Sequence, residues 1–592
     1  MANTTVSTAL IEGLIAQGVL KFFVVLGHGT TDLGEALRKA SAENKVTVIP
    51  CRNEIEASHA ATALRWTTGE GAAVVTSIGP GALQAVSASL VGASNSVGIW
   101  YIFGDETTHD EGSNMQQIPG RGQSTYFKMF SQMNETYLLH TPEAIYSALN
   151  IGALTTNHPF NPKPFFLLLP INVQPKVLKE FNKSRLHTGN ISPIGCANES
   201  AIDDVIEILN KSKKIVIKIG RGAVGAGKEL IQLADLLDGI LVISPSSLGI
   251  VPSTSPRNMG IGGSKGSISG NFAMENAELL LAVGTRAVCQ SDCSRTGYPN
   301  VSQVVNLNAD ISDAHHYNNT TALTGDIKET LITLINKLKA RQIQLFDSDW
   351  RSSCVESKER WIDFRNSVIS IESIFDENWN KKVLTQPVVI AETLNWIAQN
   401  GYKAFFDAGD VQANGFQLAE VESEGWYYTD SGSSYMGFAS SALISGGVAN
   451  SPFYGVAVTG DGSFMMNPQI LIDSVHTKTQ GCIVLLDNRR MGAISSLQLN
   501  QYKIDFATRD LVAVDYVAMA NSVKGVQGLF GGESISQLRE AFSKAKSFEG
   551  LSLIHIPVYF GEDFSGGMGS YGRWNVGPWV EEVETLISKG VL

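Results

Sequence analysis

Residues 454–471 read Y-G-V-A-V-T-G-D-G-S-F-M-M-N-P-Q-I-L, and this stretch decides the fold. Its first part is a run of small and β-branched apolar residues, which is typical of a strand buried on both faces of a parallel sheet. The run ends in Gly460-Asp461-Gly462-Ser463, and we expect a helix to begin near Asn467 with Pro468 in its first turn. The pattern predicts the strand, tight turn and helix of a doubly wound α/β domain.

The turn between this strand and its helix has the composition of an anion site. Glycines let the backbone approach a phosphate closely, and a helix N-terminus offers unpaired N–H groups. Asp461 adds a hard oxygen ligand, and a second apolar run at residues 482–486 ends in Asp487-Asn488. These residues predict a Mg²⁺ or Ca²⁺ ion clamped to a diphosphate. A tight turn without any ligand would be the preferred interpretation if Gly460-Asp461-Gly462 stood alone.

The same alternation of short apolar runs and helical patterns extends over the rest of the chain, and it favours right-handed βαβ units. We predict strands at residues 22–26, 46–50, 72–76, 98–103, 165–169, 214–219, 240–243, 279–283, 304–307, 404–407, 455–459, 482–486 and 552–556. The fold class is therefore α/β, with three doubly wound parallel-sheet domains. We expect an N-terminal domain at residues 1–190, a central domain at 191–340, a helical linker over the surface at 341–385 and a C-terminal domain at 386–592.

Composition narrows the class of partner. The chain has 592 residues and a formal charge of −12 without a basic block, so we expect neither nucleic acid nor a membrane as partner. No apolar run approaches the roughly 20 residues that a transmembrane helix needs, and we expect a soluble cytoplasmic protein. The six cysteines are scattered, which argues against a disulfide framework. Cys289 and Cys293 lack the further ligands of a zinc site, so their spacing is incidental.

The spacing from Gly460 to Asn488 resembles the motif of the thiamine diphosphate-dependent enzymes. In that family the aspartate, the asparagine and a backbone carbonyl two residues later hold the metal that binds the diphosphate. The resemblance implies that Asp461, Asn488 and the carbonyl of Arg490 are the metal ligands. It also implies that Gly460, Gly462, Ser463 and Met491 contact the cofactor.

A second motif lies near the N-terminus, where residues 48–64 read V-I-P-C-R-N-E-I-E-A-S-H-A-A-T-A-L. It resembles the family's strand that ends in a glutamate, whose carboxyl group hydrogen-bonds the aminopyrimidine ring and helps deprotonate C2 of the thiazolium. This resemblance selects Glu54. Glu56 is the competitor two residues on, and a carboxylate stabilised by the helix dipole is the structural alternative. Gly79-Pro80-Gly81 resembles the family's turn after the following strand.

A third segment, S-G-S-S-Y-M-G-F from Ser431 to Phe438, precedes the metal motif. In the family, a bulky apolar residue before glycine bends the cofactor so that its amine approaches C2. Met436 matches that position, and the carbonyl of Ser434 would accept a hydrogen bond from the amine. An ordinary core methionine is the alternative for Met436.

Within the family the chain is most similar to the acetolactate-synthase-like group, and above all to the trihydroxycyclohexane-1,2-dione hydrolases of inositol breakdown. The most discriminating segments are Asp487–Gln498 and G-S-Y-G-R-W-N-V-G at residues 569–577. The resemblance implies hydrolytic opening of a cyclic 1,2-diketone by nucleophilic covalent catalysis. His28 is the candidate proton donor, and His109 is a weaker one. His59 lies on an alanine-rich helix face, so we expect it in the core.

Other interpretations stay open. Arg489 and Arg490 depart from the hydrolase pattern, and they either bind a substrate carboxylate, which favours a 2-oxo-acid decarboxylase or carboligase, or point outward. A third hypothesis is a binding subunit without catalysis, against which Glu54 and Asp461 weigh. Residues 219–227 do not supply G-x-G-x-x-G in register, so we predict no FAD. The resemblance implies a homodimer or homotetramer in which one subunit supplies Glu54 and another the metal site.

Overall fold

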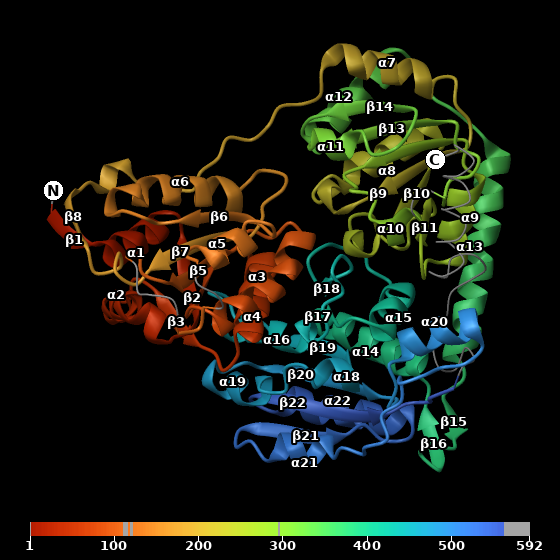
Figure 1. Cartoon of the computed structure of the whole chain (residues 1–592). Helices are drawn as coiled ribbons and strands as arrows, with labels where there is room; N and C mark the ends of the chain where they lie inside the picture. Colours follow the sequence, from red (N-terminus) through yellow and green to blue (C-terminus); the bar gives the residue numbers. More distant parts are fainter. Residues whose placement is uncertain (1, 110–115, 119–121, 294–295, 562–592) are drawn as a thin grey trace.

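The computed structural model describes residues 2–109, 116–118, 122–293 and 296–561. Within these residues it holds three six-stranded parallel sheets, each flanked by helices (Figure 1). The prediction of an α/β chain with three doubly wound domains is confirmed. Among the described residues, no helix combines the length and apolar character that crossing a bilayer requires.

The N-terminal sheet has the strand order β3-β2-β4-β5-β7-β6, and a separate antiparallel pair joins β1 to β8. Each apolar run predicted in this region overlaps one of its strands. The strands are β1 (Ala2–Thr5), β2 (Val19–Val25), β3 (Thr47–Pro50), β4 (Gly71–Thr76), β5 (Trp100–Asp105), β6 (Glu135–Leu138), β7 (Phe165–Pro170) and β8 (Val177–Phe181). The helices are α1 (Val6–Ala16), α2 (Thr31–Ala42), α3 (Glu54–Thr68), α4 (Pro80–Ser94), α5 (Thr125–Phe130) and α6 (Ile145–Thr156).

The central sheet has the order β11-β10-β9-β12-β13-β14, with five neighbouring pairs that are all parallel. Its strands are β9 (Ile215–Ile219), β10 (Ile240–Ile243), β11 (Asn258–Ile261), β12 (Leu279–Val283), β13 (Gln303–Asn308) and β14 (Thr320–Thr324). Its helices are α7 (Glu199–Leu209), α8 (Gly227–Leu237), α9 (Ile268–Asn276), α10 (Cys289–Asp292), α11 (Ile311–Ala314) and α12 (Ile327–Ala340).

The segment predicted as a helical linker is only partly helical. Its long helix α13 (Ser348–Ile369) runs along the outside of the central domain toward the C-terminal one (Figure 1). An antiparallel hairpin of β15 (Ser373–Asp376) and β16 (Lys381–Leu384) follows. The prediction missed this hairpin because strands of four residues with mixed burial show no clear period.

The C-terminal sheet has the order β18-β17-β19-β20-β22-β21, again parallel throughout. Its strands are β17 (Lys403–Phe406), β18 (Tyr427–Thr429), β19 (Gly455–Gly460), β20 (Gly481–Asp487), β21 (Val526–Phe530) and β22 (Leu551–Pro557). Its helices are α14 (Gln386–Asn400), α15 (Asp410–Leu418), α16 (Phe438–Ala442), α17 (Ile444–Val448), α18 (Asp461–Phe464), α19 (Ile470–His476), α20 (Gly492–Tyr502), α21 (Tyr516–Asn521) and α22 (Ile535–Ser547).

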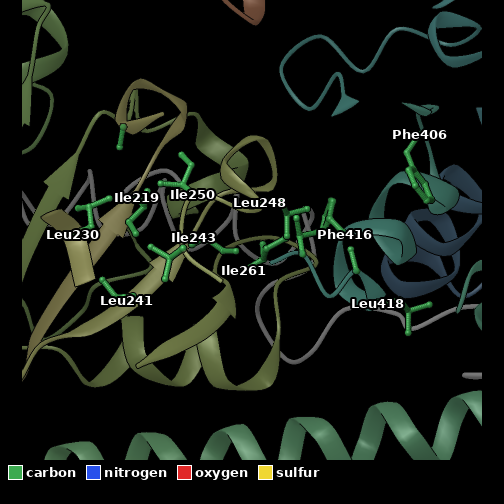
Figure 2. Close-up of a cluster of buried hydrophobic side chains, with 14 of the residues drawn as sticks. Ile219, Leu230, Leu241, Ile243, Leu248, Ile250, Ile261, Phe406, Phe416 and Leu418 are labelled. Carbon is green, nitrogen blue, oxygen red and sulfur yellow. The ribbon is translucent and has the colours of Figure 1, made fainter. Parts of the chain in front are cut away.

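The central and C-terminal domains share one hydrophobic cluster. Figure 2 shows Leu248 and Ile261 of the central domain next to Phe416 of α15. Leu418, the last residue of α15, belongs to the same cluster. All four side chains are at least 90% buried. Because this apolar surface is continuous across the two domains, it fixes the carboxyl ends of both sheets relative to each other.

Candidate functional site

Asp461 and Asn488 follow the ends of two adjacent strands. β19 and β20 pair in parallel, and Gly460 lies opposite Leu486 in their register. Because parallel strands present their carboxyl ends at one edge, the two side chains lie at the same edge of the sheet. This is the arrangement that the motif spacing predicts.

The helix after β19 begins earlier than expected. We predicted its start near Asn467, but α18 begins at Asp461 and ends at Phe464, and α19 begins only at Ile470. Pro468 therefore lies between two helices rather than in a first turn. Gly460 takes the capping position, so the backbone N–H groups of Gly462 and Ser463 belong to the first turn of α18.

Asp461 has the environment of a carboxylate that needs a cation. It is 7% exposed, and burial together with the nearby Asp487 carboxylate raises its pKa to about 7. Among the described residues, no lysine, arginine or histidine forms an ion pair with it. No cluster of three or more His, Cys, Asp or Glu side chains occurs in that part of the chain either. The residues thus fit a hard divalent cation that completes its coordination with amide, carbonyl and phosphate oxygens.

The two arginines beside Asn488 are held by the protein itself. The Arg490 guanidinium donates hydrogen bonds to Ser495 Oγ (2.6 Å), to Asp505 Oδ2 (3.2 Å) and to the Phe560 carbonyl (3.0 Å). Arg489 lies over the ring of Trp379, 4.0 Å from its centroid. Since the Arg490 side chain is 4% exposed, the expectation that it points outward is wrong, and binding of a substrate carboxylate by the two arginines stays a prediction.

The backbone carbonyl of Arg490 has a different environment from its side chain. It accepts a hydrogen bond from Gly492 N (2.9 Å), and Arg490 N donates to Asn488 Oδ1 (3.0 Å). A carbonyl oxygen has a second lone pair, so this contact is compatible with a metal ligand.

Met436 lies close to the turn at Gly460–Ser463. Its Cε lies 3.6 Å from the position that a Cβ on Gly462 would take, and the side chain is half-buried. Ser434 is exposed and has a positive φ of 50°, and its hydroxyl donates to Gln412 Oε1 (3.4 Å). The structure therefore brings the Met436 segment and the Gly460–Ser463 turn together.

Asp407 is a residue that sequence reasoning missed. It follows β17, is fully buried, and accepts hydrogen bonds from Gly437 N (2.9 Å), Ala408 N (3.0 Å) and Thr459 Oγ1 (2.9 Å). These bonds fix the backbone next to Met436. An aspartate directly after a central strand is the signal that could have identified it.

A cavity of about 1140 Å³ opens between the central and C-terminal domains. It is lined by the predicted residues Ser434, Met436, Gly460, Asp461, Gly462, Ser463, Asn488, Arg490 and Met491. The central domain lines its opposite side with the loops that follow β9, β10, β11 and β12. The cavity is large enough for a cofactor and a small-molecule substrate together.

The site residues predicted in the N-terminal domain lie together outside this cavity. Glu54 begins α3, and its Oε1 lies 2.8 Å from the position of a Cβ on Gly81. Gly79 precedes Pro80 at the start of α4 and has a positive φ of 72°, which glycine adopts without strain. The structure thus brings Glu54 and the turn at residues 79–81 together at the carboxyl edge of the N-terminal sheet.

The histidines divide into exposed and buried groups. His28 and His109 are exposed and follow β2 and β5, at the same sheet edge as Glu54. His59 is fully buried, and its ring lies 4.9 Å from that of Tyr435 between centroids. Burial lowers the pKa of His59 to about 3, so it is neutral, and its prediction as a core histidine is confirmed. Glu56 is also fully buried.

Glu54 and Asp461 belong to two separate parts of the chain. α4 starts at Pro80, beside Glu54, and ends at Ser94, which lines the cavity. Its 15 residues at about 1.5 Å each separate the two ends by roughly 22 Å. Neither Glu54 nor the turn at residues 79–81 lines the cavity. The chain therefore carries two half-sites, one with Glu54 in the N-terminal domain and one with Asp461 in the cavity.

Comparison with known proteins places this arrangement in a family. The chain belongs to the thiamine pyrophosphate enzymes, since three domain models of that family match most of its length. The N-terminal TPP binding domain matches residues 4–124, the central domain residues 202–334 and the C-terminal TPP binding domain residues 407–556. The protein accordingly carries the domains that bind thiamine diphosphate.

Similar full-length proteins narrow the comparison. The chain is 25% identical to a 3D-(3,5/4)-trihydroxycyclohexane-1,2-dione hydrolase of Shouchella clausii, over 98% of this chain and 96% of that protein. It is also 25% identical to 3D-(3,5/4)-trihydroxycyclohexane-1,2-dione hydrolase 1 of Bacillus cereus, over 96% of this chain and 92% of that protein.

Proposed function

We propose that the protein is a thiamine diphosphate-dependent hydrolase that opens a cyclic 1,2-diketone of the trihydroxycyclohexanedione type, a reaction of inositol breakdown. The observation that carries the proposal is the similarity to hydrolases of this name along almost the whole chain. The reaction consumes water and breaks the C–C bond between the two carbonyl carbons. One carbon gains the hydroxyl group and becomes a carboxylic acid, and the other gains a proton and becomes an aldehyde.

The chain's own residues supply binding and proton transfer. Asp461, Asn488 and the Arg490 carbonyl would hold Mg²⁺ or Ca²⁺ on the diphosphate, because they supply hard oxygen ligands at one strand edge. Bound thiamine diphosphate supplies a nucleophilic carbon and an electron sink. Glu54 would hold a proton at the aminopyrimidine ring, Met436 would support the bent cofactor, and His28 would donate a proton to the substrate oxygen.

The internal bonding of Arg490 weakens the alternative of a 2-oxo-acid decarboxylase or carboligase. That alternative drew on the arginines as a carboxylate site, whereas the Arg490 guanidinium already binds Ser495 and the Phe560 carbonyl. The absence of FAD and a cytoplasmic location remain predictions.

Turnover of the purified protein tests the reaction. With thiamine diphosphate and Mg²⁺, we expect loss of 3D-(3,5/4)-trihydroxycyclohexane-1,2-dione and appearance of the ring-opened acid. Glu54→Gln should lower kcat by roughly 100-fold or more, because the amide cannot exchange a proton. Rapid release of CO₂ from pyruvate, with the dione left intact, would assign the alternative function instead.

The two half-sites support a homodimer or homotetramer whose sites lie at a subunit interface, since Glu54 does not line the cavity that Asp461 lines in the same chain. Co-expression of differently tagged Glu54→Gln and Asp461→Asn chains tests this arrangement. Each homodimer is inactive, and each mixed dimer has one site with both residues intact. Random assembly should therefore restore about a quarter of wild-type activity. No recovery in purified mixed dimers would refute the shared site.

A further inference from the structure

Two lysines of the central domain, Lys265 and Lys328, line the described part of the cavity. Lys265 lies in the loop between β11 and α9, is half-buried, and lines the same cavity as Asp461 and Met436. Among the described residues it forms neither a hydrogen bond nor an ion pair. Its ammonium group therefore has three donors available for a bound molecule.

The loop that carries Lys265 is held in an unusual conformation. Lys265 has a positive φ of 59°, which residues with a side chain rarely adopt. Asn271 Oδ1 accepts a hydrogen bond from Gly263 N (2.8 Å), and Ser264 N donates to the Gln290 carbonyl (2.7 Å). Such a strained residue persists only where its surroundings determine it, and it often marks a functional site.

A buried lysine also holds the loop between β11 and α9 in place. Lys218 on β9 is fully buried, and its Nζ donates a hydrogen bond to the Gly262 carbonyl (2.9 Å). This bond fixes the loop three residues before Lys265. The direction in which Lys265 enters the cavity is thus set by the central domain and not by a mobile surface turn.

An acidic side chain of the C-terminal domain lines the same cavity as Lys265. Asp410, the first residue of α15, lines the same cavity. Burial raises the pKa of Asp410, and the positive charges of Lys265 and Arg490 act in the opposite direction. A ligand carboxylate bound here would meet the acidic Asp410 side chain as well as Lys265, so this part of the cavity suits a neutral ligand with hydroxyl and carbonyl oxygens better.

We propose that Lys265 is a specificity-determining residue that donates hydrogen bonds to the ring hydroxyl or keto oxygens of a neutral cyclic polyhydroxy ketone. The inference rests on the proposed function and deepens it, because it names the part of the substrate that the central domain recognises. A site built to bind a hydroxyl group discriminates strongly against an analogue that lacks it.

Two substrates that differ only in hydroxyl groups test this role. For Lys265→Met, we expect kcat/KM for 3D-(3,5/4)-trihydroxycyclohexane-1,2-dione to fall by roughly 10- to 100-fold, and kcat/KM for unsubstituted cyclohexane-1,2-dione to change little. Lys265→Arg should recover part of the loss. Lys478→Met is the matched control, because Lys478 also has a positive φ (53°) but is exposed and does not line the cavity. An equal loss for both diones would show that the role is merely structural and would overturn the proposal.

A binding measurement separates this proposal from the proposed function. Calorimetry on the protein loaded with thiamine diphosphate and Mg²⁺ uses myo-inositol, a neutral cyclic polyol without a carbonyl group, as probe. We expect Lys265→Met to weaken its binding by roughly tenfold. If the wild-type protein opens no dione but this difference persists, the proposed function fails and the recognition role stands. Equal binding of inositol by both proteins would overturn the role of Lys265.

Discussion

A single methyl group on Gly81 should separate catalysis from folding. Gly81 lies in the first turn of α4, and a Cβ there would stand 2.8 Å from Glu54 Oε1 and 3.7 Å from Thr76 Cβ. An ordinary contact between carbon and oxygen needs about 3.4 Å, so the Glu54 carboxylate must move by roughly 0.6 Å in Gly81→Ala. The contacted atom is the end of a flexible side chain, and the movement costs the fold little.

The expected magnitudes follow from this geometry. A displacement approaching 1 Å at a catalytic group can reduce the rate by about 100-fold, so we expect kcat to fall by roughly 10- to 100-fold. Stability should stay constant or rise, because alanine is favoured over glycine within a helix by up to about 1 kcal/mol. Activity and stability therefore change in opposite directions.

Steady-state kinetics with saturating thiamine diphosphate and thermal unfolding measure the two effects. Gly195→Ala is the control, since no heavy atom lies within 4 Å of its added Cβ. Unchanged kcat in Gly81→Ala would refute the role of Glu54 at this position. A loss of activity that merely accompanies a lower Tm would refute the argument from local displacement.

Three further predictions concern the metal, the cofactor support and a buried lysine. Chelation with EDTA should weaken thiamine diphosphate binding by roughly 100-fold, as measured by calorimetry, because the diphosphate then faces the Asp461 carboxylate without a cation, and Mg²⁺ should restore it. Met436→Ala should lower kcat by roughly tenfold with little change in cofactor affinity, and a change in affinity alone would contradict the wedge role. Burial lowers the pKa of Lys218 to about 7, so the folded protein binds fewer protons than the unfolded chain above that pH. Its stability should therefore rise by about 2 kcal/mol between pH 7 and pH 9 in chemical denaturation, and Lys218→Met should show a flatter profile.

The sequence predicted every interior strand of the three six-stranded sheets, but β3 alone among the edge strands that the structure describes. β9, β12 and β20 are buried along their whole length, and they are apolar apart from Lys218 in β9 and Asp487 at the end of β20. β14 reads T-T-A-L-T and β18 has only three residues, because an edge strand packs on fewer neighbours and keeps polar side chains. Period and composition therefore identify the interior of a parallel sheet better than its limits.

The residues of the candidate site also fall into two groups, those that the sequence predicted and those that it missed. The metal motif could be predicted, because Asp461 and Asn488 follow two strands whose ends any parallel sheet brings together. Asp410 and Lys265 could not, because they meet only through the packing of two domains far apart in sequence. The C-terminal motif at residues 569–577 lies outside the described residues, and its predicted resemblance stays untested.

The interface between the central and C-terminal domains explains why substrate specificity and cofactor binding can vary separately. Their shared apolar cluster fixes the loop of Lys265 opposite the strand ends of Asp461 and Asn488, so the cavity has one wall from each sheet. The cofactor wall depends on glycines and hard oxygen ligands, which tolerate little change. The facing wall consists of loops on a separate sheet, and substitutions there alter which ketone is bound without moving a metal ligand. A change of substrate within this family can therefore arise in the central domain, on the wall that carries Lys265, while the Gly460–Asn488 motif stays the same.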